Sequence, residues 1–176
     1  LGKFYQIPTV ALRYSIVQGS RQSFRHFYSG ALRDFSVRAA VGAPIIMQED
    51  GNQIRDFVNV KDVAAAHLAV LKSQKSDYQV FNVGSGKPMR VRDLAARVCE
   101  TAGVSFKPTY QGIFRINAPR HSVMDIAKLR TLNWNPRYNV EDSIHDYLNW
   151  LENHPEAITY WKKTYKNMYD KKILRS

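Results

Sequence analysis

Cysteine is nearly missing from this sequence, since Cys99 is the single one among 176 residues. One cysteine excludes an internal disulfide framework. Long apolar runs are missing too: none approaches the roughly 20 residues of a membrane-spanning helix, and the start of the chain lacks the pattern of a secretory signal. We therefore expect a cytoplasmic protein that binds no membrane. The chain does not begin with methionine, which fits a fragment or a processed product.

Motifs for metal binding and nucleophilic catalysis are also missing. The histidines are His26, His67, His121, His145 and His154. They show neither metal-ligand spacing nor a cysteine partner, and no serine stands in a nucleophile-elbow pattern. We expect no metal site and no catalytic residue within this chain, and we interpret His67 and Cys99 as packing residues.

Glycine is too sparse for a dinucleotide-binding loop. The only candidate is NVGSGKPM, residues 82–89, in which Met89 stands where a third glycine is expected. No acidic residue ends a following strand at the right distance. We interpret this segment as a tight strand-to-helix turn that uses the conformational freedom of glycine.

Positive charge is abundant, with a formal net charge of +11. Residues 155–176 hold six Lys or Arg against two carboxylates, and the remaining excess is spread over the body of the chain. Such spreading argues against a dedicated polyanion groove and suits a protein whose substrate is anionic.

The tail combines this charge with aromatic residues. Trp161, Tyr165 and Tyr169 follow one another at a spacing of four, which predicts a single stripe on a helix. Aromatic rings among lysines can stack on nucleic-acid bases. We favour the alternative that the stripe packs against the domain or a second subunit, as apolar helical stripes usually do.

Apolar extended runs alternate with helical patterns along the whole chain. Strands are expected at residues 9–17, 44–47, 55–60, 78–83 and 108–112. Helices are expected at residues 29–42, 60–73, 91–103, 125–132, 140–151 and 156–172. Asn139 is the expected cap of the fifth helix. This alternation predicts an α/β fold with part of a parallel sheet and an appended helical lobe.

Three arginines stand out from this pattern. Arg55 begins a strand, and Arg115 and Arg120 flank a loop, so each could present its planar guanidinium to a phosphate. The alternative is a set of structural ion pairs, with Arg55 bound to Asp56 or Asp62 and Arg120 bound to Asp125.

Four ordered motifs carry a family resemblance. They are PTVALRYSIVQGSRQS (8–23), EDGNQIRDFVNVKDVAAAHLAVL (49–71), VFNVGSGKPMRVRDLA (80–95) and RINAPRHSVMDIAKLRTLNWNP (115–136). Together they resemble the C-terminal half of an extended short-chain dehydrogenase/reductase. More narrowly, the chain is similar to the NAD-dependent nucleotide-sugar epimerases and dehydratases.

The resemblance implies a Rossmann-like cofactor half upstream and a substrate-binding α/β lobe here. Residues 1–154 would form the substrate-binding portion, and residues 155–176 a basic, aromatic helical tail. The catalytic residues and most of the NAD site would belong to the upstream half, so this portion alone would be inactive. The implied partners are a nucleotide diphosphate sugar and a second copy of the chain, with no nucleic acid.

The resemblance also assigns binding roles to individual residues. Arg55 and Arg115 fall on the two arginines that contact the substrate diphosphate, and Asn82 falls on an asparagine near the nucleotide. Tyr14 falls where the chain passes the nicotinamide end of NAD. Ile16 departs from the family, which usually has an asparagine there, and this leaves the identity of the substrate open.

Two other functions remain open at this level. The chain could be a non-catalytic module that binds a nucleotide sugar, or a nucleic-acid-binding protein that uses its basic tail. This sequence does not distinguish among epimerase, dehydratase and decarboxylase activities, because the residues that discriminate among them would lie upstream.

Overall fold

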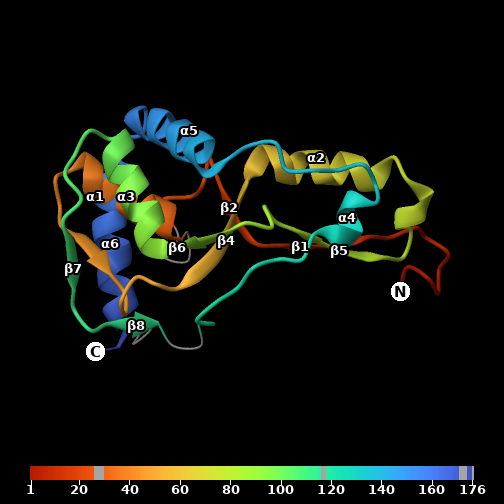
Figure 1. Cartoon of the computed structure of the whole chain (residues 1–176), viewed down its shortest axis with the longest axis horizontal. Coiled ribbons are helices and arrows are strands. Elements are labelled where there is room, and N and C mark those ends of the chain that lie inside the picture. The colour runs from red at the N-terminus through yellow and green to blue at the C-terminus, as the bar shows by residue number, and fades with distance from the viewer. Residues whose placement is uncertain (26–29, 116–117, 171–173, 176) are drawn as a thin grey trace.

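A computed structural model describes residues 1–25, 30–115, 118–170 and 174–175, apart from the side chains of 164, 165, 167–169, 174 and 175. The strands are β1 (Ala11–Tyr14), β2 (Ile16–Gln18), β3 (Ile45–Met47), β4 (Ile54–Asn59), β5 (Val80–Val83), β6 (Pro88–Arg90), β7 (Pro108–Tyr110), β8 (Phe114–Arg115) and β9 (Leu174–Arg175). The helices are α1 (Ala31–Ala40), α2 (Val60–Leu71), the short 3-10 turn η1 (Gln74–Ser76), α3 (Val91–Thr101), α4 (Ala127–Arg130), α5 (Val140–Glu152) and α6 (Ala157–Asp170). The predicted mixed α/β class is confirmed (Figure 1).

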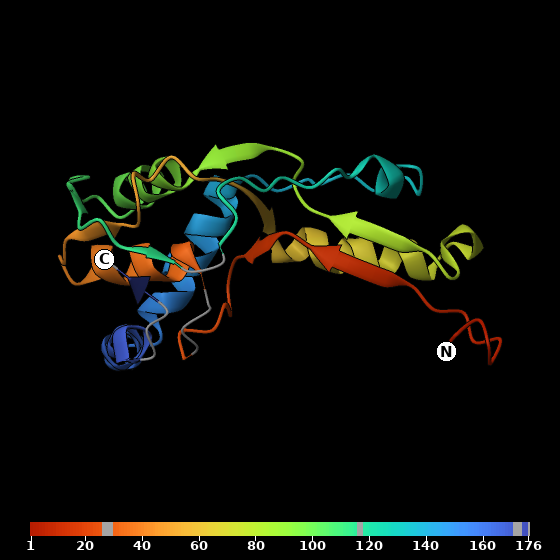
Figure 2. The same cartoon turned by 90° about the horizontal axis from the view of Figure 1, so that it is seen from below.

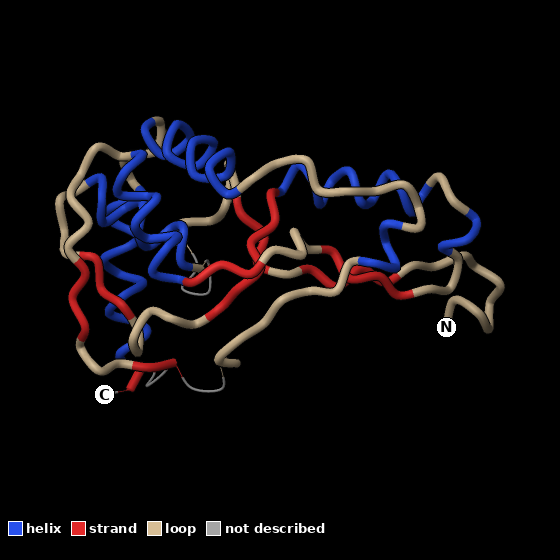
Figure 3. The backbone as a smooth tube through the Cα atoms, viewed as in Figure 1, coloured by secondary structure: helices blue, strands red, loops and turns tan. Residues whose placement is uncertain are grey.

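The strands form short sheets with mostly parallel pairing (Figure 3). β1 pairs with β5, β2 with β4, and β3 with β7, all in parallel, whereas β6 runs antiparallel to β4 and β9 antiparallel to β8. β1 and β5 run beside α2 and α4 in one limb of an elongated molecule, and α1, α3, α5 and α6 gather in the other (Figures 1 and 2). β2 and β4 connect the two limbs.

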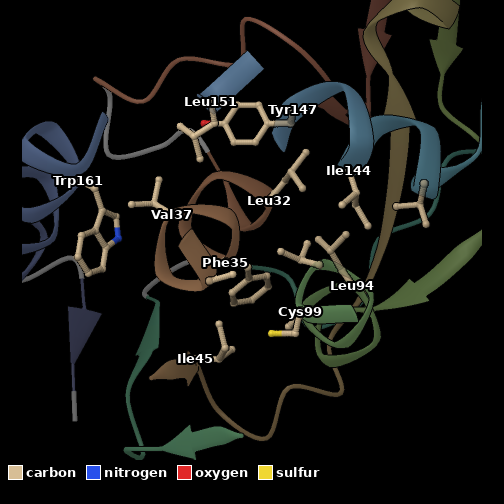
Figure 4. Close-up of a cluster of buried hydrophobic side chains, with 14 of the residues drawn as sticks. Leu32, Phe35, Val37, Ile45, Leu94, Cys99, Ile144, Tyr147, Leu151 and Trp161 are labelled. Carbon is tan, nitrogen blue, oxygen red and sulfur yellow. The ribbon is translucent and has the colours of Figure 1, made fainter. Parts of the chain in front are cut away.

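Each limb has its own apolar core. The helical limb buries a large cluster between α1, α3 and α5, including Leu32, Leu94 and Tyr147 (Figure 4). The other limb buries Val58 of β4 and Phe81 of β5, together with residues of α2 and α4. The helices of the first limb thus shield one end of β4, where Arg55 lies.

Helix α2 buries Val63, Ala66 and Val70 against the core of its limb. His67, expected to be a packing residue, is exposed on the same helix and forms hydrogen bonds through both ring nitrogens. Asn139 caps α5 in a reciprocal capping box, which confirms the predicted start of this helix. On the inner face of α5, the buried residues include Ile144, Tyr147 and Leu151.

Cys99 is fully buried on α3, and this burial raises the pKa of its thiol. Its interpretation as a core residue is therefore confirmed. Across the part of the chain that the structure describes, no helix is long and apolar enough to cross a membrane. Within the same residues, no group of three or more His, Cys, Asp or Glu side chains could hold a metal ion.

The helix after the glycine loop begins at Val91, as predicted. The short strand between them was not predicted: residues 88–90 form β6 and pair with β4. The loop therefore leads into a strand before it reaches the helix.

The tail forms α6 and packs on α1. Ala157 and Trp161 are buried in the core of the helical limb, which confirms for Trp161 that this position packs against the domain. The side chains of Tyr165 and Tyr169 lie outside the described residues. Lys162, Lys163 and Lys166 are exposed.

Candidate functional site

Arg55 lies on β4 and is half-buried. Its Nη1 donates to the backbone carbonyls of Ile54 and Arg120, both at 2.9 Å. Burial lowers the pKa of Arg55, the positive charges of Arg115 and Arg120 act in the same direction, and Glu49 opposes them. The guanidinium is thus fixed by carbonyl groups within a cluster of cations.

The alternative in which Arg55 forms a structural ion pair with Asp56 or Asp62 is wrong. Successive strand residues point to opposite faces, so Asp56 turns away from Arg55 into the interior, where it is 1% exposed. Asp62 accepts the backbone N–H groups of Arg137 and Tyr138 at 2.9 and 3.1 Å. Both carboxylates are therefore engaged elsewhere.

Asp56 organises the glycine loop. Its oxygens accept the N–H groups of Ser85 and Gly86 at 2.7 and 3.1 Å, and also the Ser85 hydroxyl and the Met124 N–H. A Cβ on Gly84 would lie 2.4 Å from Asp56 Oδ2, so glycine is required there by close packing. The N–H groups that could cradle a pyrophosphate already bind this carboxylate. The loop is structural and does not fit a site for NAD.

Arg115 lies on β8, far from β4 in sequence, and is half-buried. It lines the same cavity as Arg55, a space of about 170 Å³. The charged residues in the lining are Arg33, Asp34, Glu49, Arg55 and Arg115. The structure thus brings together the two arginines to which the family resemblance assigns a diphosphate.

Arg120 anchors the loop beside this cavity. Its guanidinium pairs with Glu49 and, at 2.6 Å, with Asp50, and it holds the pKa of Asp50 well below its usual range. The expected pairing with Asp125 is wrong, because the Asp125 carboxylate accepts the N–H of Ala127 at 2.9 Å. Arg120 therefore ties the turn before β4 to the loop whose carbonyl holds Arg55.

Asn82 and Tyr14 lie apart from the cavity, on β5 and β1. The Asn82 amide donates to the Asp125 carbonyl at 3.1 Å. The Tyr14 hydroxyl donates to His67 Nε2 at 2.9 Å, a direction set by His67 Nδ1, which donates to the Val63 carbonyl. Neither Asn82 nor Tyr14 lines the cavity of Arg55 and Arg115. The roles assigned to Asn82 and Tyr14 stay predictions.

Arg33 is a cavity residue that the sequence did not single out. It is 3% exposed on α1, and its Nη1 lies 3.5 Å from the Phe24 carbonyl. Burial is the main cause that lowers the pKa of Arg33, while the neighbouring Asp34 raises it. One signal was present: Arg33 stands one turn before the buried Val37, on the inner side of the helix.

Comparisons with known proteins find similar sequences and structures. Residues 1–84 match the model of the NAD dependent epimerase/dehydratase family. The chain is 33% identical to a dTDP-L-rhamnose 4-epimerase of Burkholderia thailandensis, over 82% of this chain and 40% of that protein. It is 31% identical to a putative UDP-glucose 4-epimerase of Methanocaldococcus jannaschii, over 86% of this chain and 48% of that protein.

A solved structure of a similar protein has a similar fold. The UDP-glucose 4-epimerase of Thermotoga maritima, crystallised with UDP-glucose, superposes with a TM-score of 0.80 at 28% identity, over 88% of this chain and 49% of that one. The chain spans less than half the length of the relatives that it matches. The fold and the sequence matches agree, and the chain belongs to the NAD dependent epimerase/dehydratase family.

Proposed function

We propose that this chain supplies the nucleotide-sugar-binding portion of an NAD-dependent nucleotide-sugar epimerase or dehydratase. The observation that carries the proposal is that Arg55 and Arg115, 60 positions apart in the sequence, line one cavity. A diphosphate carries about two negative charges, and removing it from water is costly unless charge-assisted donors replace its hydration. Two guanidinium groups from separate segments meet this requirement.

The electrostatics of Arg55 support the proposal. Its pKa is lowered by burial and by two neighbouring arginines, which means that the protein holds positive charge there at a cost. A bound anion would relieve this repulsion. Binding of this kind holds the sugar in place against reacting groups and does not itself make or break bonds.

The remaining assignments are part of the same proposal. Asn82 lies near the nucleotide, and Tyr14 near the nicotinamide end of NAD. NAD and the catalytic residues are held mainly by an N-terminal half, in the same longer chain or a separate one, so the 176 residues alone are inactive. The family resemblance adds a cytoplasmic location and a homodimer.

Calorimetric titration with UDP tests the proposal. Arg55→Gln and Arg115→Gln each remove one charged donor from the cavity, and we expect each to weaken binding by about tenfold or more, since a charge-assisted hydrogen bond is worth about 1.5–3 kcal/mol. Arg130→Gln is the matched control, because Arg130 is exposed on α4 in the other limb. Unchanged UDP affinity in both cavity variants would contradict the proposed site.

A further inference from the structure

The cavity that Arg55 lines changes from polar to apolar along β4. Gln53, Arg55 and Phe57 all line it. Because alternate residues of an extended chain point to the same face, these three side chains form one row, in which neighbours are roughly 6–7 Å apart. Gln53 stands on one side of the arginine and Phe57 on the other. A diphosphate bound at Arg55 therefore has a polar neighbour at one end and an apolar neighbour at the other.

Ile16 extends the apolar end of this row. β2 runs parallel to β4 with Ile16 opposite Phe57, and both side chains line the cavity. Phe57 is 7% exposed, and Ile16 is half-buried against the same core. Neither side chain has a hydrogen-bonding group. A ligand hydroxyl placed between them would lose its hydration and find no partner on either residue, which is unfavourable.

Helix α1 closes another side of the cavity, and α6 holds it there. Asp34 of α1 lines the cavity, and its Oδ1 accepts a hydrogen bond from Trp161 Nε1 of α6 at 2.6 Å, across 127 positions of sequence. Figure 4 shows Trp161 beside Val37 of α1. Phe35, the neighbour of Asp34, also lines the cavity and is 4% exposed. The fold itself thus fixes the shape of the cavity, as expected for a selective pocket.

We propose that Ile16 is a specificity-determining residue, which forms with Phe57 an apolar subsite for a methyl group beside the diphosphate. The substrate class is then a nucleoside diphosphate sugar that carries such a methyl group. Two parts of the ligand can supply it: the base, as in thymine, or the sugar, as in a 6-deoxyhexose. The inference rests on the proposed function, because the diphosphate at Arg55 and Arg115 sets where the subsite lies.

Calorimetric titration of the 176-residue chain with matched pairs of ligands tests this. dTDP-6-deoxyglucose and dTDP-glucose differ by one hydroxyl on the sugar, and dTDP and dUDP differ by one methyl group on the base. We expect the parent to bind the methyl-bearing member of one pair at least about fourfold more tightly, the ratio that burial of one methyl group gives. The pair that shows the preference identifies the part of the ligand that Ile16 contacts.

Two substitutions at position 16 separate polarity from shape. Valine and threonine have nearly the same shape, but threonine has a hydroxyl in place of one methyl group. We expect Ile16→Val to keep the preference of the parent and Ile16→Thr to reduce it to about twofold or less. Val17→Thr is the control, because Val17 lies on the opposite face of β2 and packs against the other core. Circular dichroism of each variant shows whether the fold persists.

The outcomes separate the two proposals. If the parent binds both members of each pair equally, or prefers the members without the methyl group, the subsite is refuted. The role of Ile16 is also refuted if Ile16→Val and Ile16→Thr show the same preference. Both results leave the proposed function intact when Arg55→Gln weakens UDP binding. If the parent binds neither UDP nor dTDP, or Arg55→Gln leaves the UDP affinity unchanged, the proposed function fails, and this inference fails with it.

Discussion

Asp56, the neighbour of Arg55 on β4, holds the glycine loop, and its replacement gives a prediction with a definite size. Oδ1 accepts from the N–H and the hydroxyl of Ser85, and Oδ2 accepts from the N–H groups of Gly86 and Met124 at 3.1 and 3.2 Å. In Asp56→Asn, the amide oxygen can keep the first pair of donors. The amide nitrogen is itself a donor, so it would face the second pair without accepting from either.

The expected loss follows from these two donors. A buried N–H without an acceptor costs about 1–3 kcal/mol, so we expect Asp56→Asn to lower the free energy of unfolding by about 4 kcal/mol. This is a large part of the roughly 5–15 kcal/mol that stabilises a typical domain.

Urea denaturation followed by tryptophan fluorescence measures this loss. Glu100→Gln, at an exposed carboxylate on α3, is the control and should leave the midpoint unchanged within error. A loss below about 1 kcal/mol for Asp56→Asn would refute the reasoning, because the two N–H groups would then have found other partners.

Two further predictions concern local stability. Asn139→Ala removes the capping box of α5 and should cost about 1 kcal/mol in the same urea assay; an unchanged midpoint would show that the cap is dispensable. Arg120 depresses the pKa of Asp50, so the stability from this pair is present above the unfolded-state pKa of about 3.9 and is lost as the pH falls toward the lower folded-state value. Melting temperatures between about pH 6 and pH 2.5 should therefore fall less in Asp50→Asn than in the parent; an equal fall would contradict the pairing.

Local patterns predicted the parts of the fold that depend on neighbours in sequence. The apolar pattern predicted a helix at residues 140–151, where α5 lies, and Asn139 marked its start correctly. The ion pair that closeness in sequence suggested between Arg55 and Asp56 was wrong. They are adjacent in sequence but lie on opposite faces of β4, and strand alternation alone could have excluded their pairing.

The candidate site was only partly predictable. The meeting of Arg55 and Arg115 followed from motif positions in a family resemblance, since spacing along the chain contains no information about a contact 60 residues away. Arg33 escaped notice because a buried arginine on an apolar helix face contradicts the usual pattern. The bond between Trp161 and Asp34 depends on how α6 docks on α1, which no local rule describes.

The bond between Asp34 and Trp161 also has a consequence for the order of events during synthesis. Because these residues are 127 positions apart, α1 leaves the ribosome long before α6 exists. Closing so long a loop is entropically costly and slow compared with forming a helix. The Asp34 side chain in the wall of the cavity is therefore held by Trp161 only after α6 has been made and has docked on α1.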